Sequence, residues 1–158
     1  MDGTKRARPF QKSDAPALLA LMRGLAEFEG YLEGFRVSED DLIRYGLGKS
    51  PRFRAYVVDG AAPGELLGMA VTYVIPWTYS MRPNLVLKEL FVAEPGRGQG
   101  VGTALMRAVI GEAKERDAHQ LLWAVLPSNR EAKEFYRSIG AHPDLCWENW
   151  SLSLDECG

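Results

Sequence analysis

Three closely spaced glycines after an apolar segment are the residues of this sequence best suited to bind an anion. Arg97 precedes Gly98, Gly100 and Gly102, and a helical pattern starts at Val101, where apolar residues recur at i, i+3, i+4 and i+7. The first N–H groups of a helix have no partner within it, and the helix dipole favours negative charge at that end. Because glycine lets a ligand approach the backbone closely, the segment is predicted to bind a phosphate group.

Other phosphate-binding motifs fit the segment poorly. An ATP-type P-loop ends in Gly-Lys-Ser/Thr, whereas Gly102 is followed directly by Thr103. The dinucleotide fingerprint G-x-G-x-x-G closes one residue early here, and it also requires a βαβ unit. The pattern Arg97-x-x-Gly100-x-Gly102, placed after a strand that ends in Leu-Phe-Val, resembles the pyrophosphate loop of GCN5-related N-acetyltransferases. An ordinary glycine-rich turn between strand and helix is the alternative.

The elements that must position this loop form an α/β pattern. Strands are predicted at 6–10, 53–58, 66–75, 85–92, 120–126 and 148–154, and helices from 14, 38, 101 and 129. The order β-α-α-β-β-β-α-β-α-β indicates a mixed α/β sheet. It resembles the order of elements in the acetyltransferase fold, which implies a mostly antiparallel central sheet flanked by helices. The length of 158 residues suits a single domain, 1–158.

Two further segments extend the resemblance. Asn129-x-x-Ala132-x-x-Phe135-Tyr136-x-x-x-Gly140 resembles the last helix of the superfamily, where the asparagine and the tyrosine face the coenzyme thiol. The N-terminal half is similar to spermidine/spermine and thialysine N-acetyltransferases. The resemblance implies direct transfer of an acetyl group from acetyl-CoA to a primary amine of a small molecule that is polyamine-, thialysine- or amino-acid-like. Two alternatives are a peptide or protein N-acetyltransferase and a CoA-binding regulatory module without turnover.

The resemblance also assigns residues to the coenzyme and to catalysis. The predicted coenzyme-binding residues are Leu90, Phe91, Val92, Arg97, Gly98, Gln99, Gly100, Val101, Gly102, Thr103, Asn129 and Phe135. Tyr136 is the candidate acid for the leaving thiolate, since a phenol can supply that proton. Its alternative role is an aromatic residue in the packing of the helix.

One pair of residues departs from the polyamine group, which has Glu-Asp where this chain has Lys88-Glu89. Neighbours in a strand point to opposite faces, so Glu89 is not expected to replace the missing carboxylate directly. Glu89 remains a candidate base, and a solvated carboxylate paired with Lys88 or Arg97 is the alternative.

Acidic and aromatic residues elsewhere are candidates for the acceptor site. Glu29 and Glu33 follow the first helix in a region that contributes to a cationic acceptor site in the polyamine-like group. Trp77 and Tyr79 are predicted to wall the acceptor pocket. The alternatives are solvated charges for the carboxylates and a loop clamped to the core for the aromatic residues.

Composition and charge limit the remaining partners. The net charge of −2 and the ordinary share of charged residues, 25%, argue against nucleic acid and membrane surfaces. Two cysteines and two isolated histidines predict no metal site, and they fit a reducing, cytoplasmic setting without a signal peptide. A homodimer is expected because the polyamine-like group pairs through its C-terminal strands and because Trp147 and Trp150 add apolar surface there.

Overall fold

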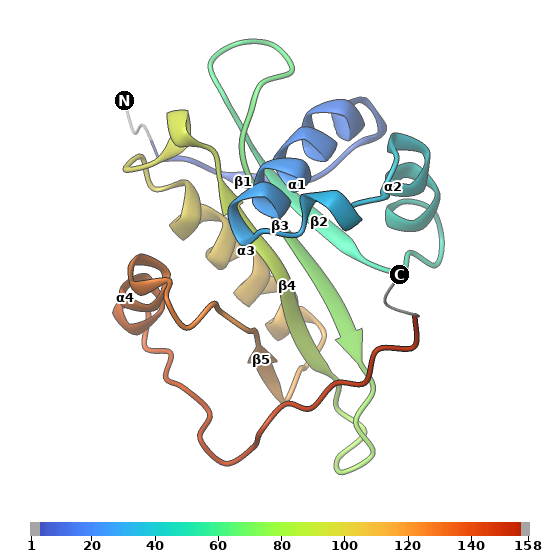
Figure 1. Ribbon diagram of the computed structural model, residues 1–158, viewed down its shortest axis with the longest axis vertical. Coiled ribbons are helices and arrows are strands. Elements are labelled where there is room, and N and C mark those ends of the chain that lie inside the picture. The colour runs from blue at the N-terminus through green and yellow to red at the C-terminus, as the bar shows by residue number, and fades with distance from the viewer. Residues whose placement is uncertain (1–3, 156–158) are drawn as a thin grey trace. The chain divides into compact units, whose positions relative to one another are not determined.

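The computed structural model describes residues 4–155 (Figure 1). The chain forms two compact units, with the boundary between Ala124 and Val125. The first unit holds the sheet and three of the α-helices, and the second holds the last helix and the C-terminal segment. A single domain spanning 1–158 stays a prediction.

A five-stranded sheet in the order β1-β2-β3-β4-β5 forms the centre of the first unit. All neighbouring strands pair antiparallel except β4 and β5, which are parallel. The strands are β1 Ala7–Pro9, β2 Arg54–Asp59, β3 Leu66–Ile75, β4 Asn84–Val92 and β5 Gln120–Leu122. The mixed, mostly antiparallel α/β class predicted from the sequence is confirmed.

Helices cover the two faces of this sheet (Figure 1). The α-helices of the first unit are α1 Ala15–Glu29, α2 Glu39–Gly46 and α3 Val101–Glu115, and the short 3₁₀ segments are η1 Lys12–Asp14, η2 Leu32–Gly34 and η3 Glu94–Gly96. Figure 1 shows α1 and α2 on the near face and α3 on the far face. No helix among residues 4–155 is both long and apolar enough to cross a membrane.

The near face is packed by the apolar stripe of α1. Leu18, Leu21, Met22 and Leu25 are buried against Met69 and neighbouring residues of the sheet. The helix stops at Gly30, which adopts the left-handed conformation that glycine tolerates best (φ 84°). Helix α2 begins with a capping box, as its sequence predicts: Ser38 Oγ accepts from the Asp41 N–H at 3.2 Å, and the Asp41 carboxylate accepts from the Ser38 N–H at 2.9 Å.

The far face is packed by α3, which also connects β4 to β5. Val101, Leu105 and Val109 are buried, and Val101 approaches so closely that a Cβ on Gly68 would lie 2.7 Å from its Cγ1. The Thr72 hydroxyl donates to the buried carboxylate of Glu112 at 2.8 Å. This bond identifies the far face as the one toward which Thr72 points.

A β-bulge interrupts β4 and changes which face its residues occupy. Val71 pairs with Glu89, but the next residue of β3, Thr72, pairs with Leu87, so Lys88 is the extra residue. Beyond the bulge, Glu89 and Phe91 lie opposite Val71 and Met69, which belong to the core on the near face. Glu89 therefore lies on the near face, whereas strict alternation from the far-face residue Leu87 would put Lys88 there instead.

The second unit contains α4, Arg130–Ser138, and no β-strand among its described residues. The strand predicted at 148–154 is wrong, and the strand predicted to reach Leu126 ends at Leu122. Trp150, Leu152 and Leu154 do alternate with polar residues, but all three are strongly exposed. Alternation describes a strand with one buried face, and the segment lacks both the burial and the hydrogen-bonded neighbour that such a strand needs.

Candidate active site

The two halves of β4 differ in how they are paired. Strand β3 accompanies β4 from Asn84 to Val92, whereas β5 pairs only with Asn84, Leu85 and Val86. Within residues 4–155 no strand pairs with the other edge of β4 from Leu87 to Val92. An open edge presents backbone donors and acceptors that an extended ligand with amide groups can use.

The glycine loop directly follows this open edge. After η3, Arg97 is extended, Gly98 has φ 73°, and Gly100 is the N-cap of α3 with φ 78°. These positive φ values explain why glycine is needed at both positions. Helix α3 begins at Val101 as predicted, so the unpaired N–H groups of a long helix lie at the end of this loop.

Arg97 joins the loop to the end of β4. Its Nε donates a 3.4 Å hydrogen bond to the Val92 carbonyl, and its side chain remains exposed. A cation therefore precedes the first residue of α3 by four positions, and the helix dipole at that end already favours an anion. Helix start, glycine backbone and guanidinium together make a site suited to a phosphate or pyrophosphate.

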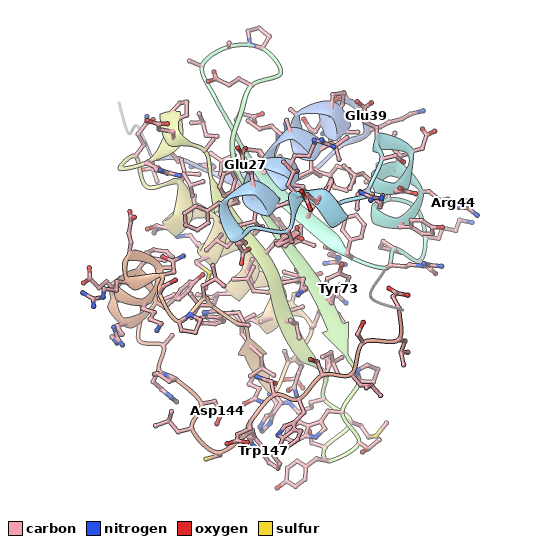
Figure 2. The ribbon with its side chains drawn as sticks, viewed as in Figure 1. Glu27, Glu39, Arg44, Tyr73, Asp144 and Trp147 are labelled. Atoms are coloured by element: carbon pink, nitrogen blue, oxygen red, sulfur yellow. The ribbon has the colours of Figure 1, made fainter. Side chains whose placement is uncertain are left out.

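A pocket of about 510 Å³ opens beside this loop on the near face of the sheet. Its lining comes from one flank of α1, from the β2–β3 turn, and from the end of β4 with η3: Ala17, Ala20, Leu21, Gly24, Glu27, Phe28, Gly64, Glu65, Leu66, Phe91, Ala93, Glu94 and Arg97. The floor is apolar, and the charged residues are three carboxylates and Arg97. Figure 2 shows Glu27 on α1. The volume is that of an ordinary small-ligand site.

The α1 flank of this pocket was not identified from the sequence. Ala17, Ala20 and Gly24 are small residues at i, i+3 and i+7, a spacing that places them on one side of a helix. A Cβ on Gly24 would lie 3.0 Å from Cε1 of Phe91, so glycine allows the aromatic ring to lie against α1. The small-residue spacing was the available signal, although the same pattern also marks simple close packing.

Glu89 lies on the near face in a partly buried position, two residues before Phe91 of the pocket lining. Loss of solvent raises the pKa of its carboxyl above the ordinary value, Lys88 lowers it, and Glu29 raises it again by repulsion. Strand alternation had placed Glu89 on the face opposite the one needed to replace the missing carboxylate. Because of the bulge, that expectation is wrong: Glu89 lies on the near face, which also holds α1 and the acidic residues at its end. A carboxylate with a raised pKa is a better proton acceptor than an exposed one.

The two acidic residues after α1 occupy different positions. Glu29 is the last residue of α1, where the helix dipole disfavours negative charge, and it acts electrostatically on Glu89. Glu33 lies in η2 and is exposed; its carbonyl accepts a hydrogen bond from Arg36 at 2.6 Å. Glu29 is therefore the acidic residue that the structure brings near Glu89.

Trp77 and Tyr79 lie at the other end of β4, in its connection to β3. Their rings stack at 4.9 Å between centroids, and Trp77 meets His119 edge-on at 4.5 Å. At ~3.3 Å per residue, the nine residues of β4 put roughly 25 Å between this connection and Val92. Within one chain the two aromatic residues clamp the connection onto the turn before β5, which was the alternative to their predicted role in the acceptor pocket.

The candidates of the second unit lie on and beside α4. Asn129 is the N-cap, and its Oδ1 accepts from the Ala132 N–H at 3.1 Å. Phe135 and Tyr136 are partly buried, with ring centroids 5.7 Å apart. The helix predicted from Asn129 onward is confirmed, and the amide of Asn129 has a structural task in starting it.

No group of three or more metal-ligating side chains exists among the described residues.

Comparison with known proteins identifies this arrangement. The family model described as "Acetyltransferase (GNAT) family" matches residues 22–141. This range includes the glycine loop, the open edge of β4, Glu89 and all of α4. The chain belongs to the GNAT acetyltransferase family.

Relatives with curated names agree with this GNAT assignment. The chain is 32% identical over 151 residues to a thialysine N-epsilon-acetyltransferase of Mus musculus, covering 92% of this chain and 88% of that protein. It is 28% identical to a spermidine/spermine N(1)-acetyltransferase-like protein 1 of Homo sapiens, of which it spans 21%. Among solved structures, a probable acetyltransferase superposes with a TM-score of 0.78 at 21% identity, covering 96% of this chain and 99% of that one. This GNAT protein is an acetyl-CoA-dependent N-acetyltransferase.

Proposed function

We propose that this GNAT enzyme transfers the acetyl group of acetyl-CoA directly to a primary amine of a small molecule that is polyamine-, thialysine- or amino-acid-like. The observation that carries the proposal is the glycine loop at the start of α3, placed beside the open edge of β4. The relatives named for thialysine and for spermidine/spermine support a small amine as acceptor.

The residues of the loop fit the charged end of the coenzyme. The backbone N–H groups from Gly98 to Thr103, with the Arg97 guanidinium, would hold the pyrophosphate. A Cβ added to Gly98 or Gly100 would meet nothing within 4 Å, so the space beside both glycines is open. The edge of β4 from Leu90 to Val92 would bind the amides of the pantetheine arm, and Asn129 and Phe135 complete the proposed coenzyme-binding set. Acetyl-CoA supplies a thioester activated toward amines.

Glu89 is the proposed base for the acceptor amine. An alkylammonium, with a pKa near 10, is almost fully protonated at neutral pH and cannot attack a thioester. Glu89 lies on the near face of the sheet, where burial raises the pKa of its carboxyl, and it would accept this proton directly or through one water. Glu29 and Glu33 would attract the cationic acceptor toward it.

Two other groups complete the proposed reaction. The backbone N–H of Val92 would stabilise the oxyanion of the tetrahedral intermediate, since a positioned donor there acts where negative charge develops. Tyr136 would protonate the leaving thiolate, whose conjugate acid has a pKa near 8.5. The motif that carries Tyr136 on α4, within the matched family range, supports this role.

We also propose that the enzyme works as a cytoplasmic homodimer. Trp147 and Trp150 are 81% and 90% exposed, and an isolated chain gains nothing from so much apolar surface. Sedimentation of the purified protein at micromolar concentration should show a dimer, and a monomer would remove this part of the proposal.

One experiment tests the proposed function directly. The protein is incubated with acetyl-CoA and a thiol reagent against polyamines, thialysine, lysine, other amino acids and short peptides. Release of CoA with a small amine supports the proposal. Turnover with peptides alone would show that peptides, and not small amines, are the acceptor class. Binding of acetyl-CoA without turnover of any amine would indicate a regulatory module.

The Gly100→Glu variant tests the placement of the coenzyme. It adds a side chain and a negative charge at a position with positive φ, where the pyrophosphate is proposed to lie. A folded variant should lose acetyl-CoA affinity in calorimetry, with Glu65→Gln at the pocket rim as the matched control. Unchanged affinity of Gly100→Glu would show that the coenzyme binds elsewhere.

A further inference from the structure

A row of aromatic rings leads from the core to the neighbourhood of Glu89. Phe10 and Phe53 stack with ring centroids 6.4 Å apart, and Phe53 meets Tyr73 edge-on, also at 6.4 Å. A Cβ on Gly46 of α2 would lie 2.5 Å from Cζ of Phe53, so α2 holds Phe53 in place. One side of the Tyr73 ring thus meets Phe53, which is itself packed against the core.

The register of β3 and β4 places Tyr73 beside Glu89. Tyr73 follows Val71 by two residues on β3 and therefore shares its face, the near face of the sheet. Val71 lies opposite Glu89, so Tyr73 is its diagonal neighbour, within reach of an aromatic side chain. Figure 2 shows Tyr73 on this strand.

Electrostatic effects agree with this geometry. Loss of solvent and the nearby Glu89 both raise the pKa of Tyr73, and the pKa of Tyr31 rises through loss of solvent, Glu89 and Glu29. Lys88 from its own strand and Glu29 from the end of α1 thus act on Glu89, and Glu89 in turn acts on Tyr31 from the turn after α1 and on Tyr73 from β3. Four segments of the chain converge on one carboxylate.

We propose that Tyr73 is a positioning residue for Glu89, and that its ring keeps water from one side of the carboxylate while leaving the other side open to the acceptor amine. Tyr73 is 38% exposed and Tyr31 is 43% exposed, so both retain surface that an acceptor can contact. The ring does not exchange protons with the acceptor. It acts through Glu89 by limiting hydration, which makes that carboxylate a stronger base.

This inference rests on the proposed role of Glu89, and it adds a residue that sets the pH range of the enzyme. If the ring is the active part, Tyr73→Phe keeps the effect and Tyr73→Ala removes it. Tyr45→Ala is the matched control, because Tyr45 is a partly buried tyrosine of α2 whose ring lies under Arg52 at 4.2 Å, away from Glu89 in its contacts.

The first readout needs no activity. Carbon-13 NMR of the side-chain carboxyl follows the titration of Glu89 in the intact protein, with Glu89→Gln identifying its signal. We expect the midpoint to fall toward the ordinary glutamate value in Tyr73→Ala, and to stay in Tyr73→Phe and Tyr45→Ala. An unmoved midpoint in folded Tyr73→Ala overturns the proposal, as does an equal fall in Tyr45→Ala.

The second readout separates this inference from the proposed function. In kcat/KM against pH, the acidic limb of Tyr73→Ala should move to lower pH and the plateau should fall severalfold, whereas Tyr73→Phe should match the wild type. If the NMR midpoint moves but the pH profile of kcat/KM does not, Tyr73 still tunes Glu89 and the assignment of Glu89 as base is wrong. If Tyr73→Phe shifts both, the hydroxyl and not the ring carries the effect, which contradicts the inference as stated.

Discussion

At its Asn84 end β4 is paired on both edges, whereas at its Val92 end it has a neighbouring strand on one edge only. The paired end is further secured by Arg82, which donates to the carbonyls of Asp117 and Ala118 at 3.1 and 3.2 Å, and by the ring contacts of His119. The open end carries a bulge, a carboxylate with a raised pKa and a loop with two residues of positive φ. One strand thus combines an end that supplies stability with an end that gives up stability for a site.

The substitution with the largest expected effect tests whether the open end of β4 is sufficient for catalysis without the second unit. Tyr136 belongs to the second unit, and Tyr136→Phe keeps its size while removing the proposed acid. We expect kcat to fall by ~10²–10⁴, the range typical of a lost general acid, with acetyl-CoA affinity nearly unchanged. A rate within twofold of wild type would show that Tyr136 only packs and that the chemistry depends on the first unit.

Glu89→Gln tests the open end itself. We expect a loss of about 10² in kcat/KM at neutral pH, partly restored as rising pH deprotonates the amine in solution. The folded-state pKa of Glu89 is raised, so stability falls as the pH rises from the unfolded-state pKa, and the loss is complete once the pH exceeds the folded-state pKa. The glutamine variant should therefore melt at a slightly higher temperature than wild type at pH 8, and the gain should vanish below pH 4.

The kinetic result of Glu89→Gln has a definite alternative. If Glu89→Gln leaves kcat/KM unchanged, Glu89 is not the base, and Lys88 stands where the polyamine group has its base without replacing it. The enzyme should then prefer acceptors of lower pKa, such as α-amines, over lysine-like amines. A comparison of kcat/KM for the α-amine of an amino acid and for a polyamine decides between these outcomes.

A third prediction contrasts Glu89 with a carboxylate that supports the fold. Asp14 accepts two hydrogen bonds from Arg8, at 2.8 and 2.9 Å, and this pairing lowers its pKa. A lowered folded-state pKa means that the stabilisation is present above the unfolded pKa and is lost as the pH falls through the folded one. Asp14→Asn should cost about 1–2 kcal/mol of unfolding free energy at pH 7. In urea titrations the difference from wild type should shrink below about pH 4, and a constant difference would contradict this account.

The smallest effect concerns the closed end. Arg82→Ala removes two hydrogen bonds and an exposed ion pair with Asp117 at 3.1 Å. We expect a loss of about 1 kcal/mol in thermal or urea unfolding, with kcat and acetyl-CoA affinity unchanged. A fall in kcat would show that the two ends of β4 are coupled and that their separation into stability and function is too simple.

Local patterns predicted several elements of the fold, including the helix start that follows the glycine loop. The start of α3 at Val101, the capping box at Ser38 and the strand at 66–75 all follow from short-range periodicity and glycine or cap chemistry, which a single sequence shows directly. The position of Glu89 did not follow, because a bulge is a relation between two strands and appears only in their register. The role of Trp77 and Tyr79 in an acceptor pocket stays a prediction, because it depends on which segments the strand pairing brings together, and a single sequence does not show that pairing.

The strand predicted at 148–154 was wrong for a related reason. Alternation of Trp150, Leu152 and Leu154 is a necessary property of a half-buried strand, but it does not supply the neighbour against which the strand must pair. The pocket beside α1 was not predicted because Ala17, Ala20 and Gly24 carry no reactive group. They contribute to the pocket by being small, which leaves open volume beside the helix.

The connectivity of the sheet also has a consequence for how the enzyme folds. Strands β2, β3 and β4 follow one another through turns, so this meander can form from contacts that are short along the chain. Strand β5 joins only after α3 has crossed the sheet, and parallel pairing across a helical connection is slow because the entropy of closing the long loop is lost first. We therefore expect the pairing between β4 and β5, where the open edge begins, to be among the last to gain protection during refolding in pulse-labelling hydrogen exchange.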